Sequence, residues 1–197
     1  QLRVALTGQK QKSERLGKVG VGRQSQASDN TAILVDGSGS LVPANWVAFD
    51  VNSFAIRDSA TGAVIRSWGS LGLCTGGGAW GDCNGLTQNV VRYDTPTFPG
   101  FSASASWGED DMWDFALRDA GEHHGFKLAA AVAYNEITGG GFANTIADPF
   151  VPGAPETQYF QAGAYIQHVA TGLFLYGAYG HNELDLGGAD FEADTYY

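Results

Sequence analysis

Charged side chains occur in two sets that could act together on a small molecule. One set is basic and falls on the polar face of segments in which apolar and polar residues alternate: Arg3, Lys18, Arg92, Arg118 and Lys127. The other set is acidic and lies in the long segment 25–88: Asp36, Asp50 and Asp58. If the fold places the two sets opposite each other, they produce an electric field between them, and that field orients a dipolar solute. In the alternative, Arg92 and Arg118 are strand-end residues that pair with Asp94 or Asp114.

Enzymatic chemistry finds little support along the chain. The Gly-Ser-Gly-Ser run at 37–40 lacks the Gly-x-Ser-x-Gly spacing of a serine esterase, and residues 20–22 lack the third glycine of a dinucleotide site. His123 and His124 are adjacent, which is more typical of a solvated turn than of a metal centre. Three consecutive acidic residues either bind Ca²⁺ weakly or form a charged loop tip: Glu109, Asp110 and Asp111. The sequence therefore predicts no catalytic residue, no cofactor and no metal centre, and it leaves the weak Ca²⁺ site open.

The composition narrows the class of protein that must position these charges. The chain has 197 residues, a formal net charge of −10 and a pI of about 4.6, which argues against nucleic-acid binding because that requires a basic face. Charged residues make up 16% of the chain, below the roughly 25% of ordinary soluble domains. No run of about 18 apolar residues is present, so the sequence predicts no transmembrane helix. Abundant glycine and 12% aromatic residues are typical of an all-β chain.

Alternation with a period of two predicts β-strands along most of the chain. It is clear in 2–7, 101–107, 113–118, 126–134 and 160–167, and weaker in 16–24, 89–94, 172–181 and 191–197. A soluble β-sandwich has the same period. Two features favour a membrane barrel: the polar faces carry small residues with isolated Arg and Lys, and aromatic rings end several apolar faces, as membrane interfaces select. Those rings are Phe101, Trp107, Trp113, Phe126, Tyr134 and Phe160.

Short and long connections are expected at opposite ends of these strands. Short turns are predicted at 10–15, 95–100, 121–125 and 170–172, and longer connections at 25–88, 136–156 and 182–190, with a modest one at 108–111. Outer-membrane barrels have this layout, with short turns on one side and longer loops on the other. We expect residues 89–181 to form an antiparallel meander in which each strand pairs with its neighbour in sequence.

Several blocks of sequence resemble the general porins of Gram-negative proteobacteria. The most specific block is Arg-Tyr-Asp-Thr-Pro-Thr-Phe at 92–98, within a similar stretch that covers 89–120. Residues 16–24, followed by Ala-Ser-Asp at 27–29, are similar to the strand that enters the long loop of those porins. The resemblance covers about residues 1–135. Two features depart from it, namely Asp119, where the family tends to have an aromatic residue, and the pair of cysteines.

The resemblance implies a fold and a function. The family forms an up-and-down antiparallel transmembrane β-barrel of about 16 strands, usually a homotrimer, whose third outside loop folds inward to narrow the pore. This chain supplies eight or nine strands and both ends look cut, so we expect one partial barrel domain over 1–197, about half of the whole, with 25–88 as the constriction loop. The pore would be lined by the charged residues of the basic and acidic sets: Arg3, Lys18, Arg92, Arg118, Lys127, Asp36, Asp50 and Asp58. The implied activity is passive diffusion of small polar or charged solutes across the bacterial outer membrane, in contact with lipid and lipopolysaccharide.

The long segment 25–88 is too apolar for a free loop. We expect its apolar residues to pack against the barrel wall: Trp46, Val47, Phe49, Val51, Phe54, Ile56, Val64, Ile65 and Trp68. Cys74 and Cys83 close a ring of ten residues, and in an oxidising envelope a disulfide between them would stabilise the loop by about 2–3 kcal/mol. The alternative function is a soluble or surface-attached β-sandwich that binds carbohydrate through exposed aromatic residues.

Overall fold

A computed structural model describes residues 9–13, 15–40, 54–67, 87–109, 111–138, 156–185 and 190–196. These residues contain strands and turns, and the described part of the chain contains no helix. The strands are β1 (Gln9–Ser13), β2 (Gly17–Ser25), β3 (Ala55–Arg57), β4 (Val64–Ser67), β5 (Thr87–Asp94), β6 (Phe101–Gly108), β7 (Trp113–His123), β8 (Phe126–Ile137), β9 (Glu156–His168), β10 (Phe174–Asp185) and β11 (Asp190–Tyr196). The predicted all-β class is therefore confirmed for the described residues.

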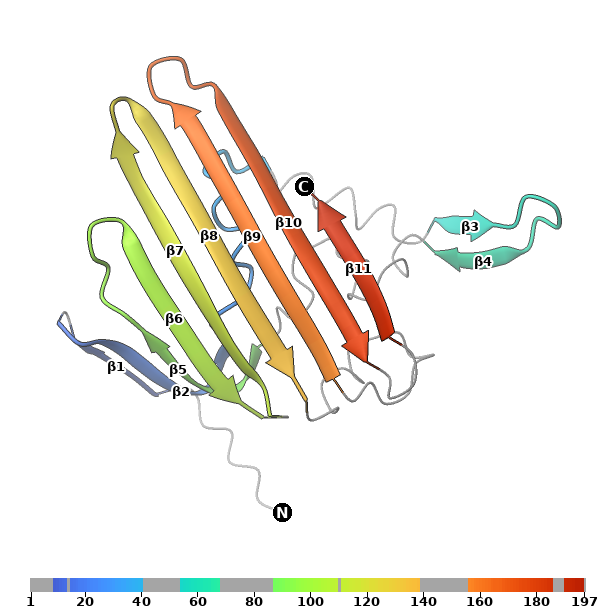
Figure 1. The fold of residues 1–197 in the computed structure, drawn as a ribbon, viewed down its shortest axis with the longest axis horizontal. Coiled ribbons are helices and arrows are strands. Elements are labelled where there is room, and N and C mark those ends of the chain that lie inside the picture. The colour runs from blue at the N-terminus through green and yellow to red at the C-terminus, as the bar shows by residue number, and fades with distance from the viewer. Residues whose placement is uncertain are drawn as a thin grey trace.

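Nine of the strands form one antiparallel sheet in the order β1-β2-β5-β6-β7-β8-β9-β10-β11 (Figure 1). Each strand pairs with its neighbour in sequence, apart from the step from β2 to β5, which the long connection with the hairpin β3–β4 separates. The expected meander over 89–181 is confirmed. The described sheet has β1 and β11 as its edges, so the described part of the sheet is open.

Short turns gather at one end of this sheet (Figure 1). The turn between β7 and β8 has only two residues, His124 and Gly125, with φ of 50° and 82°. Two positive φ values are those of a type I′ turn, whose twist matches that of the flanking strands. The adjacent histidines of the sequence therefore end a strand and begin a hairpin turn.

Two expected connections are shorter than predicted. Residues 10–13 of the turn predicted at 10–15 belong to strand β1, which pairs along its whole length with β2, and a turn follows at residues 15–16. Residues 182–190, expected as a longer connection, are mostly strand, because β10 continues to Asp185 and β11 starts at Asp190. Residues 9–13 show no apolar alternation, but a ladder of backbone hydrogen bonds requires no apolar side chain.

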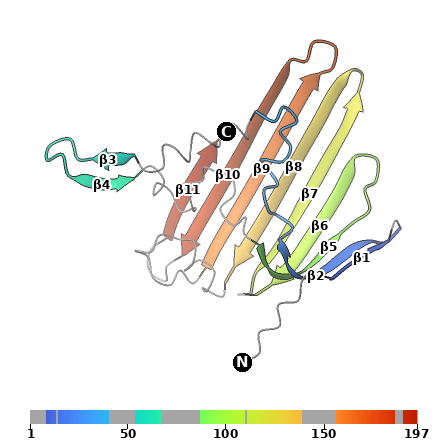
Figure 2. The same ribbon diagram turned by 180° about the vertical axis from the view of Figure 1, so that it is seen from behind.

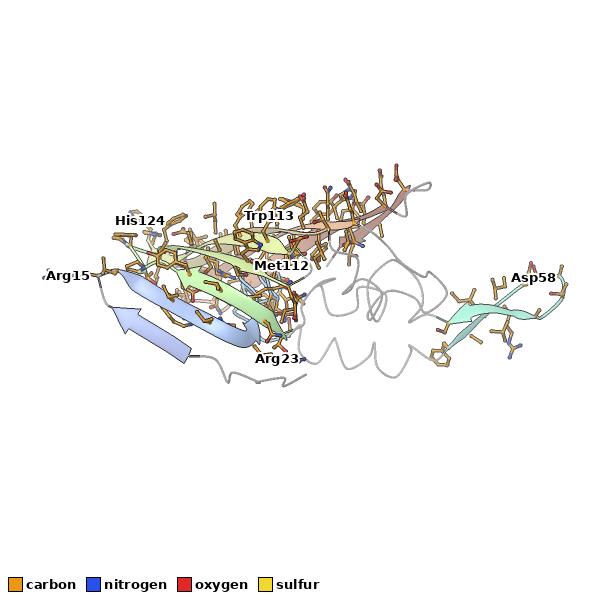
Figure 3. The ribbon with its side chains drawn as sticks, turned by 90° about the horizontal axis from the view of Figure 1, so that it is seen from below. Arg15, Arg23, Asp58, Met112, Trp113 and His124 are labelled. Atoms are coloured by element: carbon orange, nitrogen blue, oxygen red, sulfur yellow. The ribbon has the colours of Figure 1, made fainter. Side chains whose placement is uncertain are left out.

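The sheet has two chemically different faces. We call the inner face the one that carries Arg92, Asp114 and Gln161, and the outer face the one that carries Trp113, Leu117 and Phe160. Neighbouring residues Met112 and Trp113 point to opposite sides (Figure 3), and their exposed fractions are 0% and 41%. Burial alternates in the same way along β5, β7 and β9. Along these stretches the inner face is therefore covered, whereas the apolar outer face is exposed.

Candidate functional site

The chain leaves β2 and turns back across the inner face of the sheet. We call residues 26–36 the strap. Figure 2 shows this segment in blue in front of β8 and β9. The strap is a series of turns rather than a strand, with backbone hydrogen bonds from Thr31 N to Ser28 O (3.1 Å) and from Leu34 N to Asn30 O (3.0 Å). Asn30 has a φ of 53°, a value that asparagine tolerates better than most residues.

Side chains of the strap that meet the sheet are small or polar. The buried ones are Gln26, Ala27, Ser28, Thr31 and Ala32, whereas Leu34 is 72% exposed. Since these side chains bury little apolar area, the contact between strap and sheet depends on hydrogen bonds between strap backbone groups and side chains of the inner face of the sheet, which we call the wall. This differs from the expectation that apolar residues hold the long segment.

Two arginines of the predicted pore-lining set bind the strap. Arg92 Nη1 donates to the carbonyl oxygens of Ser25 (3.1 Å) and Gln26 (2.8 Å), and its Nη2 lies 2.7 Å from Asp94 Oδ1. Arg118 Nη2 donates to Ala27 O (2.6 Å) and to Thr31 Oγ1 (2.8 Å). Guanidinium donors suit this role because their five N–H groups spread in a fixed plane. The expected pairing of Arg92 with Asp94 is confirmed, and Arg92 also contacts backbone of the long segment.

A buried carboxylate anchors the first turn of the strap, residues 26–29. Asp114 on β7 is 2% exposed, and its Oδ2 accepts the backbone N–H of Ser28 at 2.6 Å. Its other oxygen accepts the hydroxyl of Ser106, and Ser106 Oγ accepts the backbone N–H of Ala27 at 3.0 Å. Two consecutive amides of the strap therefore have partners on β6 and β7.

Strand β9 binds the second turn of the strap, residues 28–32. The side-chain amide of Gln161 is fully buried, donates to Ser28 O at 2.9 Å and accepts from Ala32 N at 2.8 Å. From β10, the Tyr176 hydroxyl donates to Ala32 O at 3.0 Å. A Cβ placed on Gly163 would overlap that same carbonyl oxygen, so only glycine admits the strap backbone here.

The wall beneath the strap is made of small residues. Ala116 and Ala133 are directly opposite each other on β7 and β8, and Ala131 is opposite Gly163 on β9. The three alanines are at most 7% exposed. This stripe leaves room for backbone to lie close to the sheet, and long polar side chains on either side of it supply the hydrogen bonds.

The other predicted pore-lining residues are dispersed. Lys18 is on the inner face, with its Nζ 3.2 Å from Asp94 Oδ2. Lys127 is exposed near the short turn of β7–β8, opposite Glu122 and Gln167. Thus Lys18, Arg92 and Arg118 gather near Asp94 and the strap, whereas Lys127 lies towards one end of the wall.

The acidic set is divided between different parts of the long segment. Asp36 ends the strap and accepts hydrogen bonds from the backbone N–H (3.0 Å) and hydroxyl (2.5 Å) of Ser38. Asp58 is on the β3–β4 hairpin, apart from the nine-stranded sheet (Figure 3), and the backbone N–H of Thr61 keeps the pKa of its carboxyl below the usual value. Arg3, Asp50, Cys74, Cys83 and Asp110 lie outside the described residues.

The β3–β4 hairpin places apolar residues of the long segment in solvent-accessible positions. Phe54, Val64 and Ile65 are each about 60% exposed. These residues were expected against the wall, and in the described structure they are not buried there. Trp46, Val47, Phe49, Val51 and Trp68 are outside the described residues.

Acidic side chains collect on the outer face at the end of the sheet opposite the short turns. Together with Gln158 they line a shallow cavity of about 210 Å³, and the acidic residues are Glu156, Glu183, Asp185, Asp190 and Glu192. Among the residues that the structure describes, no group of three His, Cys, Asp or Glu side chains has a geometry that could hold a metal ion. Glu109, which the sequence left open as part of a weak Ca²⁺ site, accepts a hydrogen bond from the side-chain amide of Asn89 at 3.0 Å. The cavity therefore marks a change from apolar to acidic surface.

Sequence reasoning missed Ser106, Asp114, Gln161, Gly163 and Tyr176 as strap-binding residues. The alternating alanines of 129–133 were visible as a polar-face pattern, and they are the signal that could have indicated a close backbone approach. No sequence rule predicts which backbone amide of the strap each of these side chains binds.

Comparison with known proteins adds no relative. No family model, no curated protein and no solved structure matches the chain. Within the described residues no helix is both long and apolar enough to cross a membrane.

Proposed function

We propose that this protein is a porin that lets small polar or charged solutes diffuse passively across the bacterial outer membrane. The observation that carries the proposal is the strap, a polar segment fixed by side chains of the wall to the inner face of a sheet whose outer face is apolar and exposed. A sheet with this sidedness, closed into a barrel, encloses a polar lumen with a constriction.

The outer face supports a membrane environment. Aromatic rings form a belt near one end of the apolar region, with ring centroids 5.4 Å apart for Trp113 and Tyr134, and 5.2 Å apart for Tyr179 and Tyr196. Phe126 and His168, 5.0 Å apart, lie towards the other end. Rings at two levels with mostly aliphatic residues between them are typical of a lipid-facing surface, and Asp119 on β7 is a charged exception between the levels.

The distance between the two levels fits a bilayer. Tyr134 and Phe126 are eight residues apart on β8, and Trp113 and His123 are ten apart on β7. At about 3.4 Å per residue these separations are about 27 and 34 Å along the strands. A strand tilt of about 40° reduces them to about 21 and 26 Å, close to the apolar band of about 25 Å in outer-membrane barrels. The acidic cavity lies beyond this band, where headgroups and water begin.

The soluble alternative receives less support. A β-sandwich buries one face of each sheet against the other sheet. Here the apolar face is the exposed one, with Trp107 70% and Leu175 71% exposed, and the described part of the chain provides only the β3–β4 hairpin as a second sheet. So large an apolar surface is compatible with lipid and unfavourable in water.

A membrane barrel must also close. Unpaired N–H and C=O groups at a sheet edge are not tolerated in lipid, so we propose that further strands pair with β1 and β11. Association into a homotrimer and contact with lipopolysaccharide belong to the same proposal.

The decisive measurement is electrical. The full-length protein, purified in detergent and added to a planar bilayer, is expected to give uniform, long-lived conductance steps with a reversal potential in a salt gradient. Absence of steps, together with release of the protein from cell envelopes by a salt wash without detergent, would contradict a porin and favour the binding module.

A further inference from the structure

We infer that Gln161 and Gly163 on β9 are the residues that set how closely the strap approaches the wall, and therefore the width of the pore beside it. The consequence for the pore rests on the proposed channel function, whereas the seating of the strap does not. Both are positioning residues, which act through the strap rather than by touching a solute.

Gln161 replaces the partners that the strap backbone would have in a regular structure. Its side-chain amide has the same donor and acceptor as a peptide group and spans Ser28 O and Ala32 N. These two strap groups are four residues apart, so the glutamine holds a whole turn in shape. Because Gln161 and Ala32 are both almost fully buried, water is not at hand to replace a lost hydrogen bond.

Gly163 permits the contact that Gln161 holds. A Cβ at this position would overlap Ala32 O and lie 3.0 Å from Ala32 Cα, so an alanine side chain pushes against strap backbone rather than against a movable side chain. The neighbouring Ala164 points to the outer face and is exposed. An added methyl group on β9 therefore collides with the strap at position 163, whereas the methyl group of Ala164 lies on the other face of the sheet, away from the strap.

The two residues act on the same peptide region from different directions. Gly163→Ala is expected to push the strap away from the wall and into the lumen, which lowers conductance. Gln161→Met keeps the length of the side chain but removes both hydrogen bonds, which frees the second turn and raises conductance. The first turn stays attached in both variants through Arg118 and Asp114.

Hydrogen exchange measured by NMR on the full-length protein in detergent micelles tests the seating at single residues. Exchange at the Ala32 amide should be about tenfold faster or more in each variant, because its hydrogen bond to Gln161 is lost or stretched. The Ser28 amide, held by Asp114, should change much less and is an internal control. Ala164→Val and Gln167→Met are matched controls on the same strand and should exchange as wild type at both amides.

Single-channel recording of the same proteins tests the consequence. Support requires faster exchange at Ala32 in both variants, lower conductance in Gly163→Ala and higher conductance in Gln161→Met. Unchanged exchange in both variants overturns the inference, and so does faster exchange with wild-type conductance, which would leave the channel function intact. A wild-type protein that never conducts refutes the proposed function and the effect on the pore, while the exchange result still decides the seating.

Discussion

Replacement of Arg118 separates two roles that we propose for this residue. As a charge on the inner face it attracts anions, and as a hydrogen-bond donor it fixes the strap through Ala27 O and Thr31 Oγ1. Three variants divide these roles. Arg118→Lys keeps the charge but loses the planar fork, Arg118→Met removes charge and donors at similar length, and Arg118→Glu reverses the charge.

The magnitude of the anchoring effect follows from the two strap bonds. A hydrogen bond from a charged donor contributes about 1.5–3 kcal/mol. At the lower value the two bonds amount to about 3 kcal/mol, which corresponds to a factor of roughly 150 in the equilibrium between attached and detached strap. Such a shift should appear as added current noise and a higher mean conductance in Arg118→Met and, to a lesser degree, in Arg118→Lys.

The assay is single-channel current and reversal potential in a salt gradient. Arg118→Met should raise conductance and move selectivity towards cations, and Arg118→Glu should move selectivity further. Lys127→Met is the matched control, because it removes a positive charge from the inner face at a position far from the strap, so it should shift the reversal potential slightly and leave the noise unchanged. If Arg118→Lys behaves as wild type and Arg118→Met changes only the reversal potential, Arg118 is a pore charge alone and the anchoring argument is refuted.

Three further predictions concern the faces and the strap. Ala164→Arg places a charge on the outer face about midway between the ring levels and should make the free energy of folding into lipid vesicles less favourable by about 2–4 kcal/mol. The control Gln167→Arg places the same charge on the inner face and should fold nearly as wild type. Equal folding yields for the two variants would mean that the outer face does not meet lipid. Tyr176→Phe removes the donor to Ala32 O and should destabilise the strap by about 1 kcal/mol, seen as a few-fold faster exchange at the Ala32 amide, and wild-type exchange would show the bond to be dispensable. Asp114→Asn puts an amide where two donors point, so a lowered urea midpoint in detergent and a loss of about 1–3 kcal/mol are expected, and an unchanged midpoint would exclude Asp114 as an anchor.

The strands and their faces were predictable because their signal is local. Alternation in 113–118 and 126–134 placed Trp113 and Phe126 on one face and Asp114 and Arg118 on the other, and the short turns required neighbouring strands to pair. Strand β1 escaped because its Lys and Gln residues carry no apolar signal, although its backbone pairs fully with β2.

The path of the long segment was predictable only in part. Its length and its apolar residues indicated that it has a defined place, but the described structure holds the strap with polar contacts and leaves Phe54 and Val64 exposed. The apolar content of the long segment therefore indicated a defined position, whereas its described residues are held by polar contacts.

By itself, the sequence determined an antiparallel β meander with one polar and one apolar face, because side-chain alternation and turn residues act over a few neighbouring positions. It also placed Lys18, Arg92 and Arg118 on the same face. The folded arrangement was needed to show that Arg92 and Arg118 bind loop carbonyls, that Gln161 spans Ser28 and Ala32, and that Gly163 must lack a side chain. Those contacts join residues that are often more than 100 positions apart, and half of each contact is a backbone group, which is the same in every residue and leaves no trace in the sequence.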